Sequence, residues 1–281
     1  MASQSSTPPP QLDDRRACPA IAMVILTNLR NLPKQWIAAI VFYTQIPLPI
    51  SANLPFERAI HWAPAIGLVL GGVLDGLRYA LGQLHSPPML QATILVCLWL
   101  WVTGGLHVDG VMDTADGLAV APERRLAVMA DSVSGAFGVM AAIALLLLKT
   151  AGLVSLADVP GAWMAAAAGW GRWGQQVAIA SYPYLKAQGK GSIHQPTMRS
   201  GWDTLPSLLL LLGVCAWPLL THPSDPWMPL CLAGGVIAPI IAAWFGRQLG
   251  GHTGDTYGAV VEWTEAIALL VAGVGMSALG G

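Results

Sequence analysis

Residues 87–118 read PPMLQATILVCLWLWVTGGLHVDGVMDTADGL. The part before His107 has no charged residue and approaches the roughly 20 residues that cross the hydrocarbon core of a bilayer. The part after it contains three aspartates, Asp109, Asp113 and Asp116. Carboxylates beside lipid are costly unless they have a function or a partner. The stretch therefore predicts a membrane protein with an acidic site at one end of a helix.

The composition of the whole chain agrees with a membrane protein. Of its 281 residues, 54% are hydrophobic and only 10% are charged, whereas a soluble domain has about 25% charged residues. The formal net charge is −1, so no basic field is available for a nucleic-acid partner. The four cysteines have no paired spacing that would indicate a disulfide framework or a zinc site.

The apolar runs predict an all-α, polytopic integral membrane protein with about seven transmembrane helices. These helices are expected at residues 60–81, 88–106, 136–157, 162–181, 205–221, 228–249 and 259–280. The stretch 35–50 is shorter and ends with two prolines, which favours an interfacial or re-entrant segment. Residues 1–20 are polar and proline-rich and predict a disordered tail, which leaves residues 21–281 as a single transmembrane helical catalytic domain.

The distribution of lysine and arginine predicts how the chain is oriented in the membrane. Basic residues precede the first expected helix and recur around every second connection, whereas the connections 82–87, 158–161 and 222–227 have none. On this count the aspartate cluster, the loop 183–201 and the segment 250–265 all lie at the cytoplasmic face. Three polar patches far apart in the sequence are therefore expected to meet in one site.

The spacing of the three aspartates predicts a metal site. Positions i, i+4 and i+7 lie on one face of a helix, where unneutralised carboxylates would repel one another. Oxygen ligands without cysteine favour Mg²⁺, with Mn²⁺ as the alternative. Gly110 and Gly117 adjoin this face and would let a phosphate approach the metal. The simpler interpretation is an acidic, solvated loop at the membrane surface.

His107 precedes the cluster, and it could donate a hydrogen bond to a phosphate, act as a base or only pack. We count it, together with the three aspartates, among the candidate catalytic residues.

The segment GGHTGDTYGAVVEWTE, residues 250–265, repeats the acidic pattern more loosely. Asp255 and Glu262 are seven residues apart, as on one helix face, and we expect both to bind the metal. Thr253 and Glu265 are expected to contact the substrate. His252 and Thr253 could equally well cap the helix that follows.

Phosphoryl chemistry would also require cations for the remaining charge of the substrate. Arg172 lies in the apolar stretch AGWGRWGQQ and needs an anion as its partner. Lys186 and Lys190 flank the segment AQG of the loop that follows, although ordinary surface lysines are an equally good interpretation. Asp75 and Arg78, three residues apart, look like a local structural pair.

Several motifs, in their order along the chain, resemble cobalamin-5'-phosphate synthases, also called adenosylcobinamide-GDP ribazoletransferases. The cluster GGLHVDGVMDTADGL is similar to the signature of this family, and the stretches FYTQIPLP, PAIG, MADSVSGAFG and GGHTGDTYGAVVEWTE resemble its further blocks. Arg58 accompanies the PAIG block, and Arg172 falls where the family has an arginine. The chain departs from the family at Ala130 and Val133, where basic residues often flank the Asp-Ser pair.

The resemblance implies a Mg²⁺-dependent transferase of a bacterial inner membrane that acts late in cobalamin (vitamin B12) synthesis. A hydroxyl of α-ribazole, or of its 5'-phosphate, attacks the cobinamide-linked phosphorus of adenosylcobinamide-GDP. GMP leaves, and adenosylcobalamin or its 5'-phosphate forms. Asp131, Ser132 and Arg58 are implied to bind substrate, and other enzymes of the corrinoid pathway are plausible partners.

Two other functions are alternatives. CDP-alcohol phosphotransferases of lipid synthesis also use an aspartate-rich membrane helix, but their DG-x-x-AR motif is missing, because LAVAPERR follows Asp116-Gly117. A cation-coupled transporter would have internal repeats and acids near the bilayer midplane, and neither is evident in the sequence.

Overall fold

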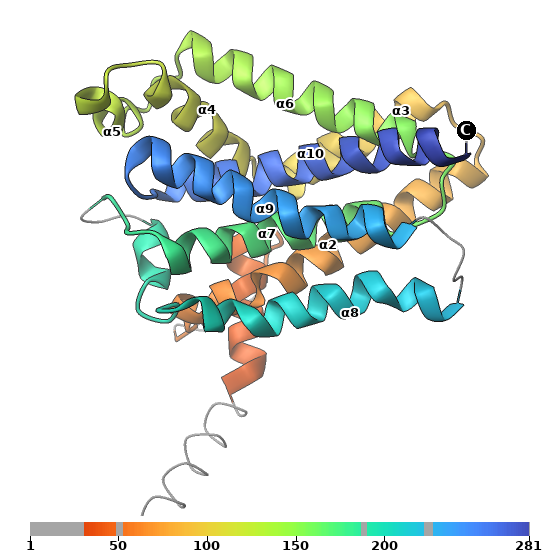
Figure 1. Ribbon diagram of the computed structural model, residues 1–281, viewed down its shortest axis with the longest axis horizontal. Coiled ribbons are helices and arrows are strands. Elements are labelled where there is room, and N and C mark those ends of the chain that lie inside the picture. The colour runs from red at the N-terminus through yellow and green to blue at the C-terminus, as the bar shows by residue number, and fades with distance from the viewer. Residues whose placement is uncertain (1–30, 49–52, 187–189, 222–226, 281) are drawn as a thin grey trace, which may run out of the picture.

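The computed structural model describes residues 31–48, 53–186, 190–221 and 227–280, and these residues fold into a bundle of helices (Figure 1). After a helical segment at 31–43, the helices are α2 (Ala59–Gln83), α3 (Pro88–Val102), α4 (Leu106–Leu118), α5 (Arg125–Val128), α6 (Ala136–Ser155), α7 (Trp163–Ser181), α8 (Leu205–Thr221), α9 (Trp227–Leu249) and α10 (Gly254–Gly280). Short 3-10 turns occur at η1 (Phe56–Arg58), η2 (Pro122–Arg124), η3 (Lys190–His194) and η4 (Gly201–Thr204). Within the described residues no strand occurs, which confirms the all-α prediction.

Four of the described helices are long and apolar enough to cross a membrane, in agreement with a polytopic membrane protein. They are α2 together with η1, α6, α9 and α10, and the pair α3 and α4 adds a fifth if it forms one bent span. All seven predicted segments are helical, but α7 is not among the helices that are apolar enough to cross a membrane, because it contains an arginine and two glutamines. Other helices surround α7, so its residues need not be as apolar as those of a helix that faces lipid.

The second predicted span, 88–106, is shorter in the structure than expected. Helix α3 ends at Val102, and α4 starts at Leu106 after a bend of 89°. Gly104 and Gly105 lie between them with φ angles of +66° and +67°, a left-handed conformation that side chains other than glycine rarely adopt. The two glycines thus turn the aspartate-bearing helix away from the axis of α3.

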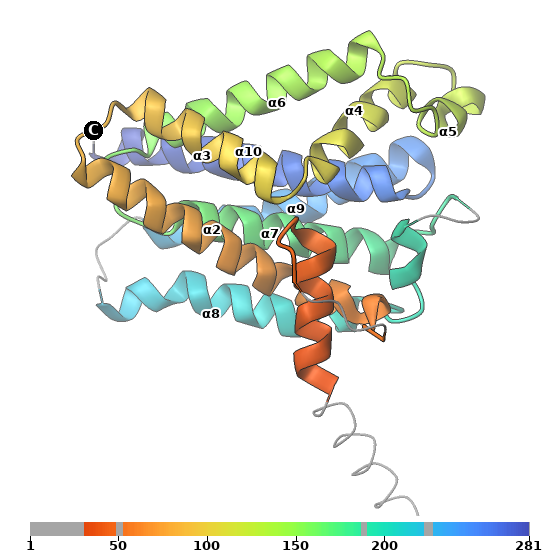
Figure 2. The same ribbon diagram turned by 180° about the vertical axis from the view of Figure 1, so that it is seen from behind.

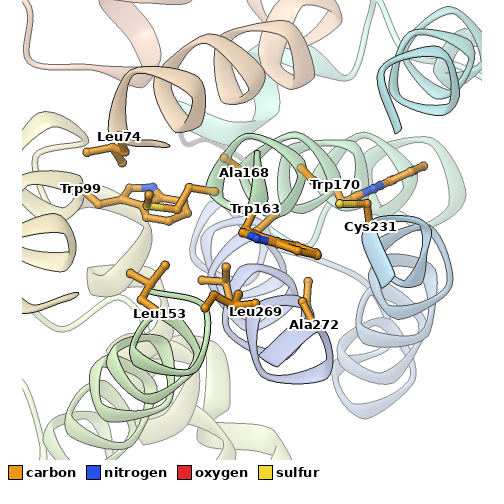
Figure 3. Close-up of a cluster of buried hydrophobic side chains, with 14 of the residues drawn as sticks. Leu74, Trp99, Leu153, Trp163, Ala168, Trp170, Cys231, Leu269 and Ala272 are labelled. Atoms are coloured by element: carbon orange, nitrogen blue, oxygen red, sulfur yellow. The ribbon is translucent and has the colours of Figure 1, made fainter. Parts of the chain in front are cut away.

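Helix α7 forms the centre of the bundle and packs against α2, α9 and α10. Small residues allow this, because Cβ atoms at Gly67 and Gly71 of α2 would overlap the backbone of α7. Figure 3 shows the buried apolar cluster around α7, to which six other helices, α2, α3, α6, α8, α9 and α10, contribute. Its labelled residues are Leu74, Trp99, Leu153, Trp163, Ala168, Trp170, Cys231, Leu269 and Ala272.

Asp75 and Arg78 form the local structural pair that the sequence predicted. Asp75 accepts hydrogen bonds from the amides of Met164 and Ala165, at the start of α7. Arg78 donates to carbonyl oxygens between α6 and α7 at 2.9–3.1 Å. These carbonyls belong to Leu156, Ala157, Val159 and Gly161. One side chain therefore binds carbonyl groups along the connection between α6 and α7.

The three polar patches lie at the same end of the bundle. This end contains helices α4 and α5, the segment after α7 and the turn between α9 and α10 (Figure 1). The connections after α2 and α6 lie at the opposite end. The helical segment 31–43 runs across the direction of the long helices (Figure 2). This orientation agrees with a segment that does not span the membrane.

Candidate active site

A cavity of about 460 Å³ lies at the end of the bundle where the polar patches meet. This volume is within the range of small-molecule sites, roughly 300–1,000 Å³. The helical segment 31–43, η1, α4, α7, η3 and α10 all contribute to its wall. Its lining residues are Val41, Phe42, Phe56, Leu106, His107, Asp109, Gln175, Tyr184, Lys186, Gly191, His194, Gly254, Asp255, Tyr257 and Gly258. The predicted residues His107, Asp109, Lys186 and Asp255 thus share one cavity.

A close crossing of α4 and α10 brings the two acids of the cavity together. A Cβ atom at Gly110 would overlap the carbonyl of Asp255, and one at Gly258 would press on the backbone of His107. We expected Gly110 and Gly117 to leave room for a phosphate, and this expectation was wrong. The backbone of α10 fills the space beside Gly110, and the side chain of Met129 fills the space beside Gly117.

Asp255 is held by two neighbours. The ammonium of Lys186 lies 2.7 Å from its Oδ2, and the hydroxyl of Thr253 donates to the same oxygen at 3.2 Å. Asp113, half-buried on α4, lies within electrostatic range of Asp109, Asp255 and Lys186. Asp109, Asp113 and Asp255 therefore form one acidic neighbourhood with Lys186 as its cation.

Asp116 serves a different purpose from the other two aspartates of α4. It is 9% exposed, and it accepts hydrogen bonds from the amides of Gly135 at 2.6 Å and Gly138 at 2.8 Å. These amides belong to the first turn of α6, where backbone donors lack partners within the helix. The sequence grouped Asp116 with the metal ligands, but the structure uses it to cap α6 from a neighbouring helix.

Glu262 and Glu265 also differ from the sequence-based expectation. Both accept a hydrogen bond from Lys149 of α6 at 2.6 Å, and Glu265 pairs with Arg172 at 2.9 Å. All four side chains are buried, and none lines the cavity. The expected roles of Glu262 in metal binding, and of Arg172 and Glu265 in substrate binding, do not agree with this arrangement. The anion that Arg172 needs is supplied by the protein itself.

The other predicted residues lie in several places. Arg58, Asp131 and Ser132 are exposed and outside the cavity wall, and the side chain of Asp131 accepts a hydrogen bond from the amide of Val133 in a local turn. The side chain of Lys190 lies outside the described residues. Thr253 is buried and contacts Asp255 rather than the open cavity.

Thr253 caps α10, one of the two roles considered for it, and His252 contacts this cap through the hydroxyl of Thr256. The Thr253 hydroxyl accepts from the amide of Thr256, and the Thr256 hydroxyl accepts from the amide of Thr253. The ring nitrogens of His252 lie 3.0 Å from the Thr256 hydroxyl and 3.1 Å from the carbonyl of Ala242. Burial lowers the pKa of His252 to about 4, so this ring is neutral at pH 7.

The donor set of the cavity fits a magnesium ion that is shared with a substrate. Within the described residues, no three His, Cys, Asp or Glu side chains are close enough to form a metal site from protein alone. Mg²⁺, however, usually keeps several waters and binds through about one or two carboxylates plus substrate phosphates. Asp109 and Asp255, with Asp113 beside them, provide such carboxylates without a nearby thiolate.

Sequence reasoning missed several residues. Lys149 interrupts the apolar run ALLLLKTAG, and an ionisable residue inside a span is itself a signal. Phe42, Gln175 and His194 line the cavity, but no spacing in the sequence connects them. They meet only because the helical segment 31–43, α7 and η3 converge.

Comparison with known proteins gives one consistent result. The family model described as cobalamin-5-phosphate synthase matches residues 35–273. An adenosylcobinamide-GDP ribazoletransferase of Trichormus variabilis is 52% identical over 238 residues, which cover 84% of this chain and 94% of that protein. A protein of the same name from Synechocystis sp. is 47% identical over 83% of this chain and 92% of its own length. Another from Desulfitobacterium hafniense is 38% identical over 85% of this chain and 96% of its own length.

No solved structure gives a significant match to the chain. The family model nevertheless covers most of its length, including every residue that lines the cavity, and the relatives match along nearly their whole length. On this evidence, the chain belongs to the cobalamin-5-phosphate synthase family.

Proposed function

We propose that this protein is an adenosylcobinamide-GDP ribazoletransferase, a multi-pass enzyme of a bacterial inner membrane with its cavity on the cytoplasmic side. A ribose hydroxyl of α-ribazole, or of its 5'-phosphate, attacks the cobinamide-linked phosphorus of adenosylcobinamide-GDP. The new P–O bond replaces the bond to GMP, which leaves with the electron pair of the broken P–O bond. The products are GMP and adenosylcobalamin or its 5'-phosphate.

The observation that carries this proposal is the shared cavity of Asp109 and Asp255, next to Lys186. A pyrophosphate at this wall meets the ammonium of Lys186, which can balance the charge of the departing GMP. Asp109, Asp113 and Asp255 would hold Mg²⁺, or Mn²⁺ in its place, and the ion would neutralise pyrophosphate oxygens there. His107 and Asp109 line the cavity and are the candidates to accept the hydroxyl proton.

The orientation rests on the distribution of basic residues. Helix α5, which follows Arg124 directly and begins with Arg125, lies at the end of the bundle where Lys186 lines the cavity, as the positive-inside rule requires of a cytoplasmic face. Cysteine-accessibility labelling in intact cells tests this placement. Labelling of a cysteine at position 132 from outside the cell would contradict it.

The activity is tested with the detergent-purified full-length protein. Adenosylcobinamide-GDP, α-ribazole and Mg²⁺ should yield GMP and adenosylcobalamin, and EDTA should stop the reaction until Mg²⁺ is restored. Asp113→Asn should lose turnover while its chromatographic profile and thermal transition stay unchanged. Wild-type turnover in this variant, or in the presence of EDTA, would contradict the metal assignment.

Parallel assays separate the competing functions. Release of CMP from CDP-diacylglycerol plus an alcohol, with no product from adenosylcobinamide-GDP, would identify a CDP-alcohol phosphotransferase instead. Turnover in detergent, where no compartments exist, excludes transport as the sole activity.

A further inference from the structure

Part of the cavity wall contains none of the acids. We call this part the aromatic recess and define it by Val41, Phe42, Phe56, Gln175 and His194. These residues come from the helical segment 31–43, η1, α7 and η3, whereas Asp109 and Asp255 come from α4 and α10. The rings of Phe42 and His194 lie 4.9 Å apart in an edge-to-face contact. The recess thus offers apolar and aromatic surfaces beside the reaction centre.

Two polar side chains of the recess have buried atoms without a hydrogen-bond partner of standard geometry. His194 is 0% exposed and Gln175 is 5% exposed. The Oε1 atom of Gln175 and the ring nitrogens of His194 make no hydrogen bond of standard geometry within the described part of the chain, although the backbone of Glu57 lies next to the His194 ring. A buried polar atom without a partner costs about 1–3 kcal/mol, so such atoms at a cavity wall indicate a ligand that supplies the partner.

The chemistry of these two side chains defines a complementary ligand. Burial lowers the pKa of His194 to about 4, so its neutral ring has one N–H donor and one acceptor nitrogen. The Oε1 atom of Gln175 accepts a hydrogen bond and therefore matches a hydroxyl. A flat, largely apolar heterocycle with a single acceptor nitrogen, joined to a sugar, can accept from the N–H of His194, donate a sugar hydroxyl to Gln175 and stack on the aromatic walls.

The two substrates of the proposed reaction differ in how well they match the recess. The benzimidazole of α-ribazole has one free ring nitrogen and is otherwise hydrocarbon. The guanine of the donor has several donors and acceptors, and most would be buried without partners in the aromatic recess, whose polar side chains are Gln175 and His194. The corrinoid is larger than a cavity of about 460 Å³ can enclose.

We propose that the aromatic recess binds the benzimidazole base of α-ribazole, with His194 hydrogen-bonded to the free ring nitrogen and Gln175 to the ribose. The ribose then lies between the base and the acids Asp109 and Asp255. The corrinoid remains outside the cavity and presents only its pyrophosphate to these acids. This inference rests on the proposed function.

The test is a steady-state comparison of His194→Leu and Gln175→Leu in the full-length protein. Each variant should raise KM for α-ribazole by about tenfold, because one buried hydrogen bond to this substrate is lost. KM for adenosylcobinamide-GDP should stay within about twofold of the wild-type value. Gln91→Leu is the matched control, because Gln91 is also a buried glutamine but lies outside the cavity wall. It should leave both KM values unchanged.

Competition provides a second readout on the wild-type protein. Free benzimidazole should inhibit competitively with α-ribazole, whereas guanosine should not. Unchanged KM for α-ribazole in both variants, or a raised KM for adenosylcobinamide-GDP alone, would overturn the inference. Competition by guanosine against α-ribazole would assign the recess to guanine and overturn it as well.

Direct binding separates this inference from the proposed function. Calorimetry with α-ribazole requires no turnover, and it should show binding to the wild-type protein and a weaker signal with His194→Leu. His194→Gln, which keeps a donor and an acceptor, should retain part of the affinity if the loss is chemical rather than structural. If the wild-type protein binds α-ribazole but shows no turnover, the proposed transferase activity is refuted and the recess is not. If the wild-type protein shows turnover and His194→Leu binds α-ribazole as tightly as the wild type, the role of the recess is refuted and the activity is not.

Discussion

Asp116 and Asp109 lie on the same short helix, and their side chains have different partners. Asp116 is hydrogen-bonded to the amides of Gly135 and Gly138, whereas Asp109 is exposed at the cavity. A carboxylate that caps a neighbouring helix contributes to stability, and one that faces a cavity is available for chemistry.

We therefore expect opposite effects from two matched substitutions. Asp116→Asn removes the charge and one acceptor at the start of α6, and it should lower the free energy of unfolding by roughly 1–2 kcal/mol. Asp109→Asn should abolish turnover and leave the thermal transition unchanged. Differential scanning fluorimetry in detergent and the GMP-release assay measure the two effects. An inactive Asp116→Asn protein of wild-type stability would show that Asp116 belongs to the reaction centre after all.

His252 predicts a pH dependence of stability. Its pKa is lowered from 6.5 to about 4 in the folded protein, because its ring is buried. Between these values the unfolded chain binds a proton that the folded chain does not, so the free energy of unfolding falls as the pH decreases from 6.5 to about 4. Above pH 6.5 both states are neutral and the contribution is constant.

Thermal unfolding between pH 4 and pH 7 measures this slope, and His252→Gln should reduce it. A residual slope is expected, since the pKa of His194 is lowered by burial in the same way. A variant with the full wild-type slope would mean that His252 does not contribute.

At the scale of elements, one arginine joins the ends of α6 and α7. Arg78 donates to four carbonyl groups of the connection between them. Arg78→Met keeps most of the side-chain volume but leaves these carbonyls without their charged donor, which should cost roughly 1–3 kcal/mol of stability. The exposed Arg124 provides the control, because Arg124→Met should leave the transition temperature unchanged. Equal transition temperatures for both variants would show that the hydrogen bonds of Arg78 to this connection do not stabilise the protein.

The crossing of α4 and α10 predicts a loss of activity from a single methyl group. Gly110→Ala would force a Cβ atom into the carbonyl of Asp255 and separate the helices that hold Asp109 and Asp255. Turnover should fall by about tenfold or more, because a small misplacement of catalytic groups is costly. Gly76→Ala in α2 meets nothing within 4 Å and should keep wild-type activity. Similar activity of the two variants would show that the distance between the helices is not critical.

A buried charge network joins several helices across the bundle. Lys149 of α6, Arg172 of α7 and the two glutamates of α10 balance one another, and the Lys149 ammonium also lies 4.3 Å from the centre of the Trp99 ring of α3. The network connects four helices through side chains that are almost completely shielded from water.

Lys149→Met leaves an unpaired negative charge in this interior and should destabilise the protein by roughly 3–5 kcal/mol. Lys149→Met combined with Glu262→Gln restores neutrality, so the double variant should be more stable than the single one. A double-mutant cycle of transition temperatures measures the coupling. Additive effects would show that the two side chains do not depend on each other. Wild-type activity in the folded double variant would support a structural rather than a metal-binding role for Glu262.

The sequence alone was sufficient for properties that depend on local patterns. Apolar runs of about 20 residues give the positions of the helices, because the thickness of the bilayer fixes their length. The alternation of basic loops correctly implied that Asp109, Lys186 and Asp255 would meet at one end of the bundle. The ordered motifs pointed to the family to which the chain belongs, because they are short contiguous stretches that can be recognised without knowing what packs against them.

The choice of partners for individual charges was decided only by the tertiary structure. Helical spacing placed Asp116 beside Asp109, but whether a carboxylate faces a cavity or a neighbouring helix depends on what packs against that face. Glu262 meets Lys149, 113 residues away in sequence, and no local pattern contains that distance. A hydrogen bond requires its two heavy atoms within about 3.2 Å, and the attraction between opposite charges is strongest at contact. The function of each charged residue therefore follows from spatial neighbours that only the packed helices bring within reach.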